Sequence, residues 1–423
     1  MSQSDRESGF WTGLMPLLSP VKLQDFLSEY WESKPLHLTR RSPDYYRTLI
    51  EADDFDFIIS TACQLRNESV ELLCREQSRG VSKGARYPER VASLFEAYQG
   101  GATVRVNSVE RYWRPLWALC REMQRELGFP IRANLYCSPA KSQGARRHYD
   151  THDVLVLQVA GRKHWRVFGP LFKFPVRGFP ALPFERADEL EMRRGANHRK
   201  RVGLEDMPCG EPVIDVWLES GDLLYLPRGW VHEAWTEEDS PSAHLSVGLH
   251  ALTWMDVLTV ALGQVANQEE ELRQALPHGF ATDPAASAKT QEVFRNVLQL
   301  FAERARGGAA LEEAAVSFAW QQHGLGEGAI FGSSEPVRLT PGMLLEHRPH
   351  LNLRFRIEGE AVLLVSNHKI FSVPKLLAVS VRFIAAHRSF RPAEIPGGLS
   401  DNSKMALALR LMQDGFLRVS PRQ

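Results

Sequence analysis

The feature that most constrains this chain is a short stretch in which His148 and Asp150 lie two residues apart. They come just before a nearly unbroken apolar run from Asp153 to Val159, which is typical of a β-strand buried on both faces. Alternate residues of an extended chain point to the same side. We therefore expect the His148 imidazole and the Asp150 carboxylate to point the same way at the mouth of a sheet.

A second stretch, from Gly221 to His232, supplies another histidine. Gly221, Pro227, Gly229 and His232 follow the pattern Gly-x5-Pro-x-Gly-x2-His. This is the spacing of the second signature motif of cupin barrels. The glycines permit a tight turn and close backbone approach, and Pro227 ends a strand. The turn is expected to carry His232 back over the barrel mouth.

Two histidines and one carboxylate form the ligand set of non-haem Fe(II) oxygenases, which leaves coordination positions open. Either motif alone also fits ordinary polar residues at strand ends, with Asp150 capping a turn. Both motifs in this order favour a metal site. His148, Asp150 and His232 are thus the candidate iron ligands and the candidate catalytic residues.

The composition is that of an ordinary globular protein, with 43% hydrophobic and 24% charged residues in 423 positions. The 51 basic and 51 acidic side chains cancel, so no general attraction to nucleic acid follows. The five scattered cysteines indicate reduced thiols. There is no signal-peptide core and no apolar run of membrane-spanning length. The sequence predicts a cytoplasmic protein without a membrane partner.

Helical periodicity precedes the two motifs and strand periodicity surrounds them. Strands are expected between Ile131 and about Leu252, with a turn at Gly161-Arg162. Together these segments predict an α+β domain over residues 1–252. The flanking helices are expected at about 20–31, 53–63, 90–100 and 113–127.

The rest of the chain divides into two further predicted domains. Three amphipathic helices predict a helical domain over 253–325, read either as a dimerisation unit or as simple intramolecular packing. Small hairpins beside helices predict a winged-helix-like domain over 326–423. The helix expected at 402–413 holds only Lys404 and Arg410 as cations, so no direct DNA binding is expected.

A long insertion, residues 174–212, is rich in Pro, Gly and Arg and includes a basic cluster at 193–201. Loops of this length are usually functional or mobile. A solvated loop and a contact with RNA around the substrate both remain open for this cluster.

Several motifs together resemble the Jumonji-C (JmjC) ribosomal oxygenases, a family of 2-oxoglutarate-dependent hydroxylases that modify histidine or arginine in ribosomal proteins. The resemblance implies a double-stranded β-helix (jelly-roll/cupin) barrel that uses Fe(II), 2-oxoglutarate and O2. It also implies a ribosomal protein substrate and a homodimer. The motifs are Trp31–His37, Val104–Val106, Asn134–Pro139, Ser142–Gly144, His148–Asp150, Leu157–Gln158, Gly161–Val167 and Tyr225–His232.

The resemblance also implies roles for two basic side chains. Lys163 matches the position whose ammonium group binds the distal carboxylate of 2-oxoglutarate, and Arg105 matches a position that contacts substrate. Strand alternation places Asn134 and Tyr136 on one face, where they are expected to hydrogen-bond cosubstrate or substrate. Ser246 shares a face with His244 on the last strand and is expected to border the cosubstrate.

The identity of the substrate stays open. An arginine substrate would favour a carboxylate, for which Asp153 is the nearest candidate, whereas a histidine would need neutral groups such as Asn134 and Tyr136. Ser246-Val247-Gly248 resembles the bacterial arginine hydroxylase, but Lys163 stands where that enzyme has arginine. Two other functions compete: a JmjC-type N-methyl-lysine demethylase, and a non-enzymatic metal-binding cupin scaffold.

Overall fold

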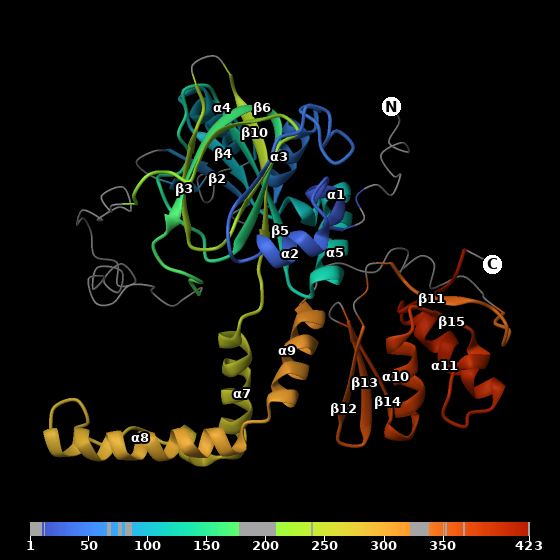
Figure 1. Ribbon diagram of the computed structural model, residues 1–423. Helices are drawn as coiled ribbons and strands as arrows, with labels where there is room; N and C mark the ends of the chain where they lie inside the picture. The colour runs from blue at the N-terminus through green and yellow to red at the C-terminus, as the bar shows by residue number, and fades with distance from the viewer. Residues whose placement is uncertain are drawn as a thin grey trace. The chain divides into compact units, whose positions relative to one another are not determined.

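The computed structural model divides into two compact units, Met1–Ala251 and Leu252–Gln423, each of which is described by itself (Figure 1). The basic cluster at 193–201 and most of the insertion around it lie outside the described residues. A further division of the second unit near residue 325 stays a prediction. The structure describes residues 11, 13–65, 69–74, 78–80, 87–176, 209–237, 240–321, 338–349, 351, 353–366 and 369–421.

Antiparallel strands form the body of the first unit. They are β1 Leu36–Leu38, β2 Val70–Leu73, β3 Ser78–Gly80, β4 Thr103–Val106, β5 Ile131–Ser138, β6 Asp153–Pro170, β7 Ile214–Glu219, β8 Leu223–Leu226, β9 Trp230–Trp235 and β10 Ser242–Leu249. One sheet runs in the order β1-β8-β6-β10-β5-β4-β2-β3, and β7 and β9 pair with the second half of β6. This jelly-roll arrangement with flanking helices confirms the predicted fold class.

Strand β6 belongs to both sheets and is 18 residues long. The predicted turn at Gly161-Arg162 is therefore wrong, because the strand bends there and continues. Gly161 has a φ of 62°, and a Cβ at this position would lie 1.9 Å from the carbonyl oxygen of Pro241. Only glycine fits such a close backbone approach in a left-handed conformation.

A β-bulge precedes this bend. Ala243 of β10 lies opposite Ala160, whereas the next residue, His244, lies opposite Gln158, so Val159 is an extra residue on β6. One inserted residue reverses which side chains face each side of the strand. Before the bulge, odd-numbered residues face the helices. After it, odd-numbered residues such as Lys163 face the space between the two sheets.

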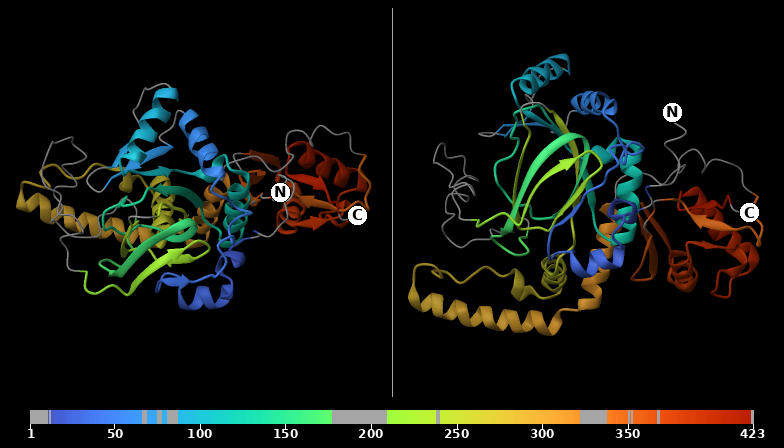
Figure 2. Two further views of the ribbon diagram at one scale, coloured as in Figure 1. Left: turned by 90° about the horizontal axis from the view of Figure 1, so that it is seen from above. Right: turned by 45° about the horizontal axis from the view of Figure 1, so that its top comes forward.

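The two faces of the main sheet pack into separate cores. Leu155 and Leu157 pack with the helices in the larger core, whereas Val154, Val156 and Trp165 belong to a smaller core between the sheets. Figures 1 and 2 show α1, α2 and α5 gathered along one side of the strands. The helices are α1 Met15–Leu18, α2 Leu23–Glu29, α3 Asp54–Gln64, α4 Tyr87–Gln99 and α5 Arg114–Leu127.

Helices α3, α4 and α5 lie close to their predicted bounds, but the first expected helix does not begin at Pro20. The N–H of Ser19 donates to the carbonyl of Met15 and so ends α1. The next helix, α2, begins at Leu23, three residues after Pro20, and follows an extended Lys22. Ser-Pro was therefore a helix stop here and not a helix start.

The second unit begins with three helices, α7 Trp254–Gln268, α8 Pro284–Arg304 and α9 Gly307–Gln321. A capping box between Thr253 and Asp256 starts α7, and the Asp283 side chain caps α8. None of the residues of α8 is buried. Within this unit α7 packs against α9, and α8 extends away from that pair (Figure 1).

The remaining part of the second unit has its own core of buried residues, such as Leu345, Phe390 and Leu411. It contains two three-stranded sheets, β15-β11-β16 and β12-β13-β14. Its winged-helix-like character stays a prediction. The elements are β11 Leu345–His347, β12 Arg354–Glu358, β13 Ala361–Ser366, β14 Lys369–Pro374, α10 Ala378–Ala386, β15 Ser389–Phe390, α11 Asp401–Gln413 and β16 Leu417–Val419.

Substituting Gly161 tests whether the bend of β6 needs glycine. Gly161→Ala should lower the free energy of unfolding by about 3 kcal/mol or more, because backbone atoms must move to admit the methyl group. Gly128→Ala is the matched control, since its φ is also positive but no atom lies within 4 Å, and it should cost about 1 kcal/mol. Urea denaturation of both variants measures the difference, and equal losses would contradict the prediction.

Candidate metal centre

The backbone brings the two ligand-bearing segments together. The N–H of His148 donates to the carbonyl of His232 at 3.0 Å, and the N–H of His232 donates back at 2.8 Å. These two bonds form an isolated antiparallel bridge between the segment before β6 and strand β9. The N–H of Gly229 also donates to the carbonyl of Asp150 at 2.9 Å. His232 lies in strand β9, which begins directly after the predicted turn.

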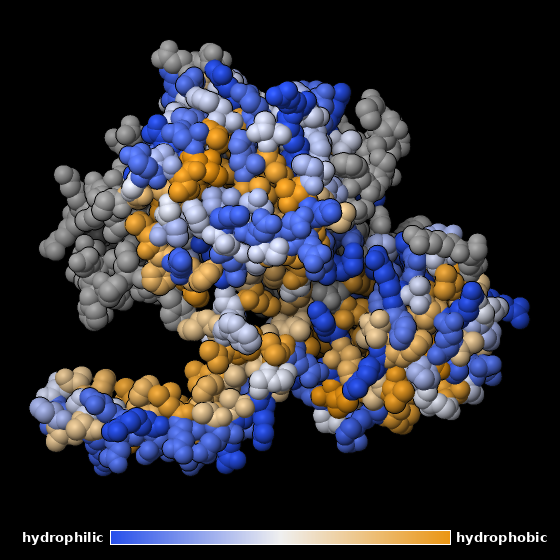
Figure 3. Space-filling view, viewed as in Figure 1, coloured by the Kyte–Doolittle hydropathy of each residue, from blue (hydrophilic) through white to orange (hydrophobic). Residues whose placement is uncertain are grey.

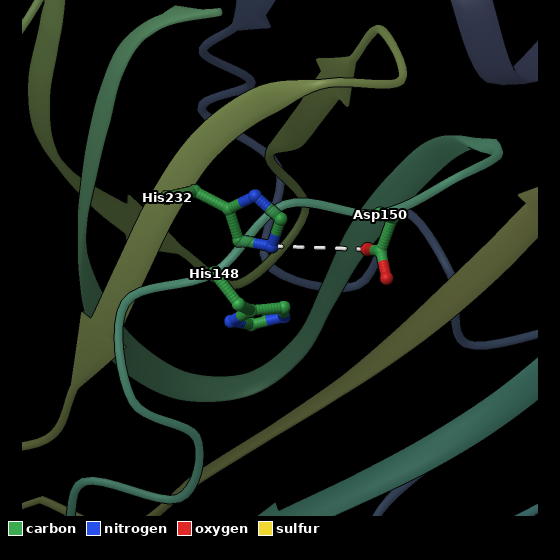
Figure 4. Close-up of side chains that lie close together, drawn as sticks. All are labelled: His148, Asp150 and His232. Atoms are coloured by element: carbon green, nitrogen blue, oxygen red, sulfur yellow. Dashed lines mark ion pairs between the residues drawn. The ribbon is translucent and has the colours of Figure 1, made fainter. Parts of the chain in front are cut away.

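The three predicted ligand side chains converge. One ligand atom from each of His148, Asp150 and His232 lies within 4.8 Å of the others. His232 Nε2 is 3.8 Å from Asp150 Oδ2, and the two imidazole rings are 4.3 Å apart at their centroids. Figure 4 shows the three side chains pointing toward one another. These distances are short enough for one ion to contact all three.

Backbone carbonyls orient both imidazoles. His148 Nδ1 lies 2.7 Å from the carbonyl oxygen of Arg146, and His232 Nδ1 lies 3.1 Å from that of Trp230. A carbonyl oxygen only accepts, so Nδ1 carries the proton when each ring is neutral. Nε2 then offers its lone pair, which is the usual second-shell arrangement of metal-binding histidines.

The charges of this cluster suit a divalent cation. Burial, together with the nearby His148, lowers the pKa of His232 to about 4, so that its ring is neutral near pH 7. Burial alone would raise the pKa of Asp150, but His148, His152 and His232 outweigh it and lower that pKa. A carboxylate between two imidazoles supplies the 2-His-1-carboxylate donor set of non-haem iron.

Lys163 lies between the two sheets and is 3% exposed. Its ammonium group donates to Ser138 Oγ at 2.8 Å, and Ser138 Oγ lies 2.9 Å from Thr103 Oγ1. Burial lowers the pKa of Lys163 to about 8. Among the described residues Lys163 forms no ion pair. A buried ammonium group of this kind would be stabilised by the carboxylate of a bound anion.

Two buried nitrogen atoms near Lys163, Trp165 Nε1 and His244 Nδ1, have no hydrogen-bond partner among the described residues. The His244 ring stacks on the Tyr136 ring, with their centroids 4.8 Å apart. The centroid of the Trp165 ring lies 5.5 Å from that of His244 and 6.0 Å from that of His232. The sequence predictions did not include Trp165, although it lies two residues after Lys163 on the same strand face. A polar ligand would satisfy both atoms.

The other predicted residues differ in how close they come to this cluster. The Arg105 guanidinium lies 6.0 Å from the centre of the Tyr136 ring and forms an ion pair with Glu71. The side-chain oxygen of Asn134 accepts a hydrogen bond from the backbone N–H of Ser108, so it partly serves the fold. Ser246 lies directly opposite Asn134 in the pairing of β10 with β5 and is partly exposed.

Asp153 is not brought into this cluster. It lies before the bulge on the face of Leu155, and it is fully buried on the helix side of the sheet. Its two oxygens accept from Tyr225 Oη at 2.8 Å and from Arg228 Nη1 at 3.2 Å. Both oxygens of Asp153 are thus engaged within the fold, and its contact with substrate stays a prediction.

Comparisons with known proteins point to one family. Residues 108–257 match the JmjC domain family. Ribosomal oxygenase 1 of Danio rerio is 31% identical over 272 residues, which is 62% of this chain and 45% of that protein. Ribosomal oxygenase 1 of Gallus gallus is 30% identical over 322 residues, which is 71% of this chain and 49% of that protein. The bifunctional lysine-specific demethylase and histidyl-hydroxylase NO66 of Dictyostelium discoideum is 29% identical over 275 residues, which is 63% of this chain and 49% of that protein.

The chain therefore spans about half the length of these curated relatives. Among solved structures it is similar to YcfD, a ribosomal oxygenase from Escherichia coli in complex with cobalt and 2-oxoglutarate. The TM-score is 0.50 at 18% identity, covering 94% of this chain and 98% of that one. At this identity the similarity shows a shared fold.

Proposed function

We infer that this chain, which carries a JmjC domain at residues 108–257 and is homologous to the ribosomal oxygenases, is an Fe(II)- and 2-oxoglutarate-dependent oxygenase. The observation that carries this proposal is the convergence of His148, Asp150 and His232, with both histidine Nε2 atoms free to bind a metal. The similar YcfD structure contains cobalt and 2-oxoglutarate.

When bound, Fe(II), 2-oxoglutarate and O2 supply the oxidising power that hydroxylates a C–H bond. The residues of this chain hold and orient those groups. His148, Asp150 and His232 hold the ferrous ion, and Lys163 binds the distal carboxylate of the cosubstrate. Trp165 and the apolar residues between the sheets keep water away from the ammonium group, which strengthens its attraction for the carboxylate.

We propose a side chain of a ribosomal protein as the substrate, because the relatives are ribosomal oxygenases. Arg105 and Tyr136 are the described residues proposed to contact it. Tyr136 offers a hydroxyl group to either cosubstrate or substrate, as do the Asn134 amide and Ser246. The position of Asp153 leaves an arginine substrate without the carboxylate that was expected for it. Histidine is therefore the substrate residue that this geometry favours.

A second function is supported by the relatives that carry a demethylase name. The NO66 protein of Dictyostelium discoideum is described as both a lysine-specific demethylase and a histidyl-hydroxylase. N-methyl-lysine demethylation would use the same iron and cosubstrate residues. A non-enzymatic scaffold, in contrast, would bind metal without consuming 2-oxoglutarate.

Mass spectrometry of ribosomal proteins separates these functions. Incubation of the protein with Fe(II), 2-oxoglutarate and a ribosomal protein fraction should add the mass of one oxygen atom to one residue. Asp150→Ala should abolish the addition, because the ferrous ion loses its only carboxylate ligand. Formaldehyde release from methylated histone peptides without any oxygen addition would favour demethylation. Absence of 2-oxoglutarate turnover with every substrate would contradict the proposed enzyme.

Lys163 should make cosubstrate binding depend on pH. Its pKa of about 8 in the free protein means that the ammonium form is present below pH 8 and is lost above it. Binding of 2-oxoglutarate above pH 8 must therefore take up a proton, and its KM should rise by about tenfold per pH unit.

Two variants check this prediction. Lys163→Met should raise the KM for 2-oxoglutarate by about 10- to 100-fold at pH 7. Lys163→Arg should keep binding and remove the rise above pH 8, because guanidinium stays charged. Lys34→Met, which changes a half-exposed lysine, is the control. A pH-independent KM in the unchanged protein would contradict the assignment of Lys163.

We also propose that the protein is a homodimer formed through α7 and α8. Figure 3 shows apolar side chains along one side of α8 and polar ones along the other. Trp254 is 76% exposed, Phe294 60% and Leu298 49%, although large apolar side chains are usually buried. Large exposed apolar patches usually mark interfaces, and homo-oligomers most often pair two identical patches.

Phe294→Asp should convert the dimer to a monomer, because it places a charge in the centre of the proposed interface. Asn296→Asp is the matched control, since two residues along a helix correspond to about 200° of rotation and so to the opposite side. Analytical ultracentrifugation of both variants measures the mass. A monomeric unchanged protein, or a dimer in Phe294→Asp, would contradict the proposed interface.

Other partners and the compartment remain proposals. In α11 the two cations are engaged within the unit, since Lys404 donates to the carbonyl of Ala393 and Arg410 pairs with Asp414. This supports our proposal that the protein does not bind DNA directly. No helix among the described residues is long and apolar enough to cross a membrane. A cytoplasmic location and an RNA contact through residues 193–201 are also proposed from the sequence.

A further inference from the structure

Arg228 lies in the turn between β8 and β9, and its side chain is 9% exposed. A single atom, Nη1, lies 2.5 Å from Glu32 Oε1 and 3.2 Å from Asp153 Oδ2. One cation therefore bridges two carboxylates that are far apart in the sequence. Hydrogen bonds of this charge-assisted kind are stronger than neutral ones.

Tyr225 completes a closed ring with these three residues. Its hydroxyl group donates to Asp153 Oδ1 at 2.8 Å and accepts from the backbone N–H of Glu32 at 2.9 Å. Asp153 and Tyr225 are both fully buried. Burial raises the pKa of Asp153, but Tyr225 and Arg228 partly offset this effect by stabilising the carboxylate. Within this buried network the Asp153 carboxylate and the Tyr225 hydroxyl group have partners, whereas Arg228 Nε has none among the described residues.

The ring is close in sequence to the metal ligands. Asp153 follows Asp150 by three residues, and Arg228 precedes His232 by four. Gly229, next to Arg228, donates its N–H to the carbonyl of Asp150. The Arg228–Asp153 contact therefore fixes the two segments that carry Asp150 and His232 relative to each other, from the side of the sheet opposite Lys163.

Glu32 adds an independent observation. Its φ is +56°, a left-handed conformation that costs a residue other than glycine about 1 kcal/mol. A glycine would adopt this conformation freely, but only a side chain with a carboxylate can also reach Arg228. Glu32 belongs to the Trp31–His37 motif, for which no role had been found in the sequence.

We propose that the ring of Glu32, Tyr225, Asp153 and Arg228 is a positioning network for the metal centre, with Arg228 as its central positioning residue. The proposal rests on the proposed function, because it assumes that His148, Asp150 and His232 bind a divalent ion. It gives the upstream Trp31–His37 motif a role in metal binding. Removing Arg228 would leave Asp153 buried without its counter-ion and would loosen both ligand-bearing segments.

Titration of the full-length protein with Co(II), followed by its visible absorption, tests the proposal without any substrate. Arg228→Met should weaken Co(II) binding by about 10- to 100-fold, as the loss of second-shell partners usually does. Arg228→Lys should stay within about threefold of the unchanged protein, because one nitrogen makes both contacts and lysine supplies one charged nitrogen. The titration is made under conditions in which circular dichroism shows Arg228→Met to be fully folded, so that a general loss of stability does not lower the measured affinity.

Arg166→Met is the matched control, because it breaks an ion pair with Asp215 in which both side chains are about 40% exposed. It should leave Co(II) affinity unchanged. Arg228→Met with the affinity of the unchanged protein would overturn the proposal. If Arg228→Met does not fold, Glu32→Gln decides instead. Several-fold weaker Co(II) binding relative to Glu29→Gln is then expected, and equal binding overturns the proposal.

The Co(II) titration distinguishes a failure of the proposed function from a failure of the positioning network. Failure of the unchanged protein to bind Co(II) would remove the metal centre, and with it both the proposed function and the positioning network. Normal Co(II) binding by the unchanged protein and by Arg228→Met would remove only the network. Normal Co(II) binding without any hydroxylation would remove the proposed activity and leave the network to be decided by the variants.

Discussion

The structure depends on one antiparallel bridge, the pair of backbone hydrogen bonds between His148 and His232. Those bonds involve main-chain atoms, so they fix the two histidines side by side whatever else the side chains contact. Once the pair is fixed, each ring needs only one further restraint, which the carbonyls of Arg146 and Trp230 provide. Two residues that are far apart in the chain thereby present Nε2 atoms toward the same point. Asp150 joins them because the turn after β8 holds its carbonyl through the N–H of Gly229.

The sequence predicted this cluster because short motifs encode local geometry. The glycine and proline spacing of residues 221–232 specifies a turn, and His-x-Asp specifies two side chains a fixed distance apart, so the ligand identities could be read directly. The long strand β6 could not be read in this way. Gly161 is usually a turn signal, and nothing in the sequence distinguishes a turn from a strand that bends and crosses to a second sheet. That distinction is made by the carbonyl of Pro241, which approaches from a distant part of the chain.

The bulge at Val159 affects the candidate site more directly than the bend at Gly161 does. Strict alternation puts Asp153 and Lys163 on the same face, and both were expected near the substrate or cosubstrate. One extra residue separates them, so Lys163 faces the space between the sheets and Asp153 faces the helices. A bulge has no reliable sequence signature in an apolar run such as residues 154–160, because each residue there tolerates burial on either face. The inward position of Trp165 likewise follows from the bulge, since Trp165 lies on the same strand face as Lys163.

Arg228 and Lys163 are two buried cations of the first unit that lie on opposite sides of the main sheet. Arg228, on the helix side, contacts Glu32 and Asp153, and its charge is compensated by the protein itself. Lys163, between the sheets, contacts the Ser138 hydroxyl group and no described carboxylate. A buried charge that the fold compensates contributes to structure, whereas one that the fold leaves uncompensated costs free energy until an anion binds. The same strand thus supplies Asp153 to the proposed positioning network and Lys163 to the proposed cosubstrate site. Their opposite environments, and not their residue types, determine which of them is available to a cosubstrate.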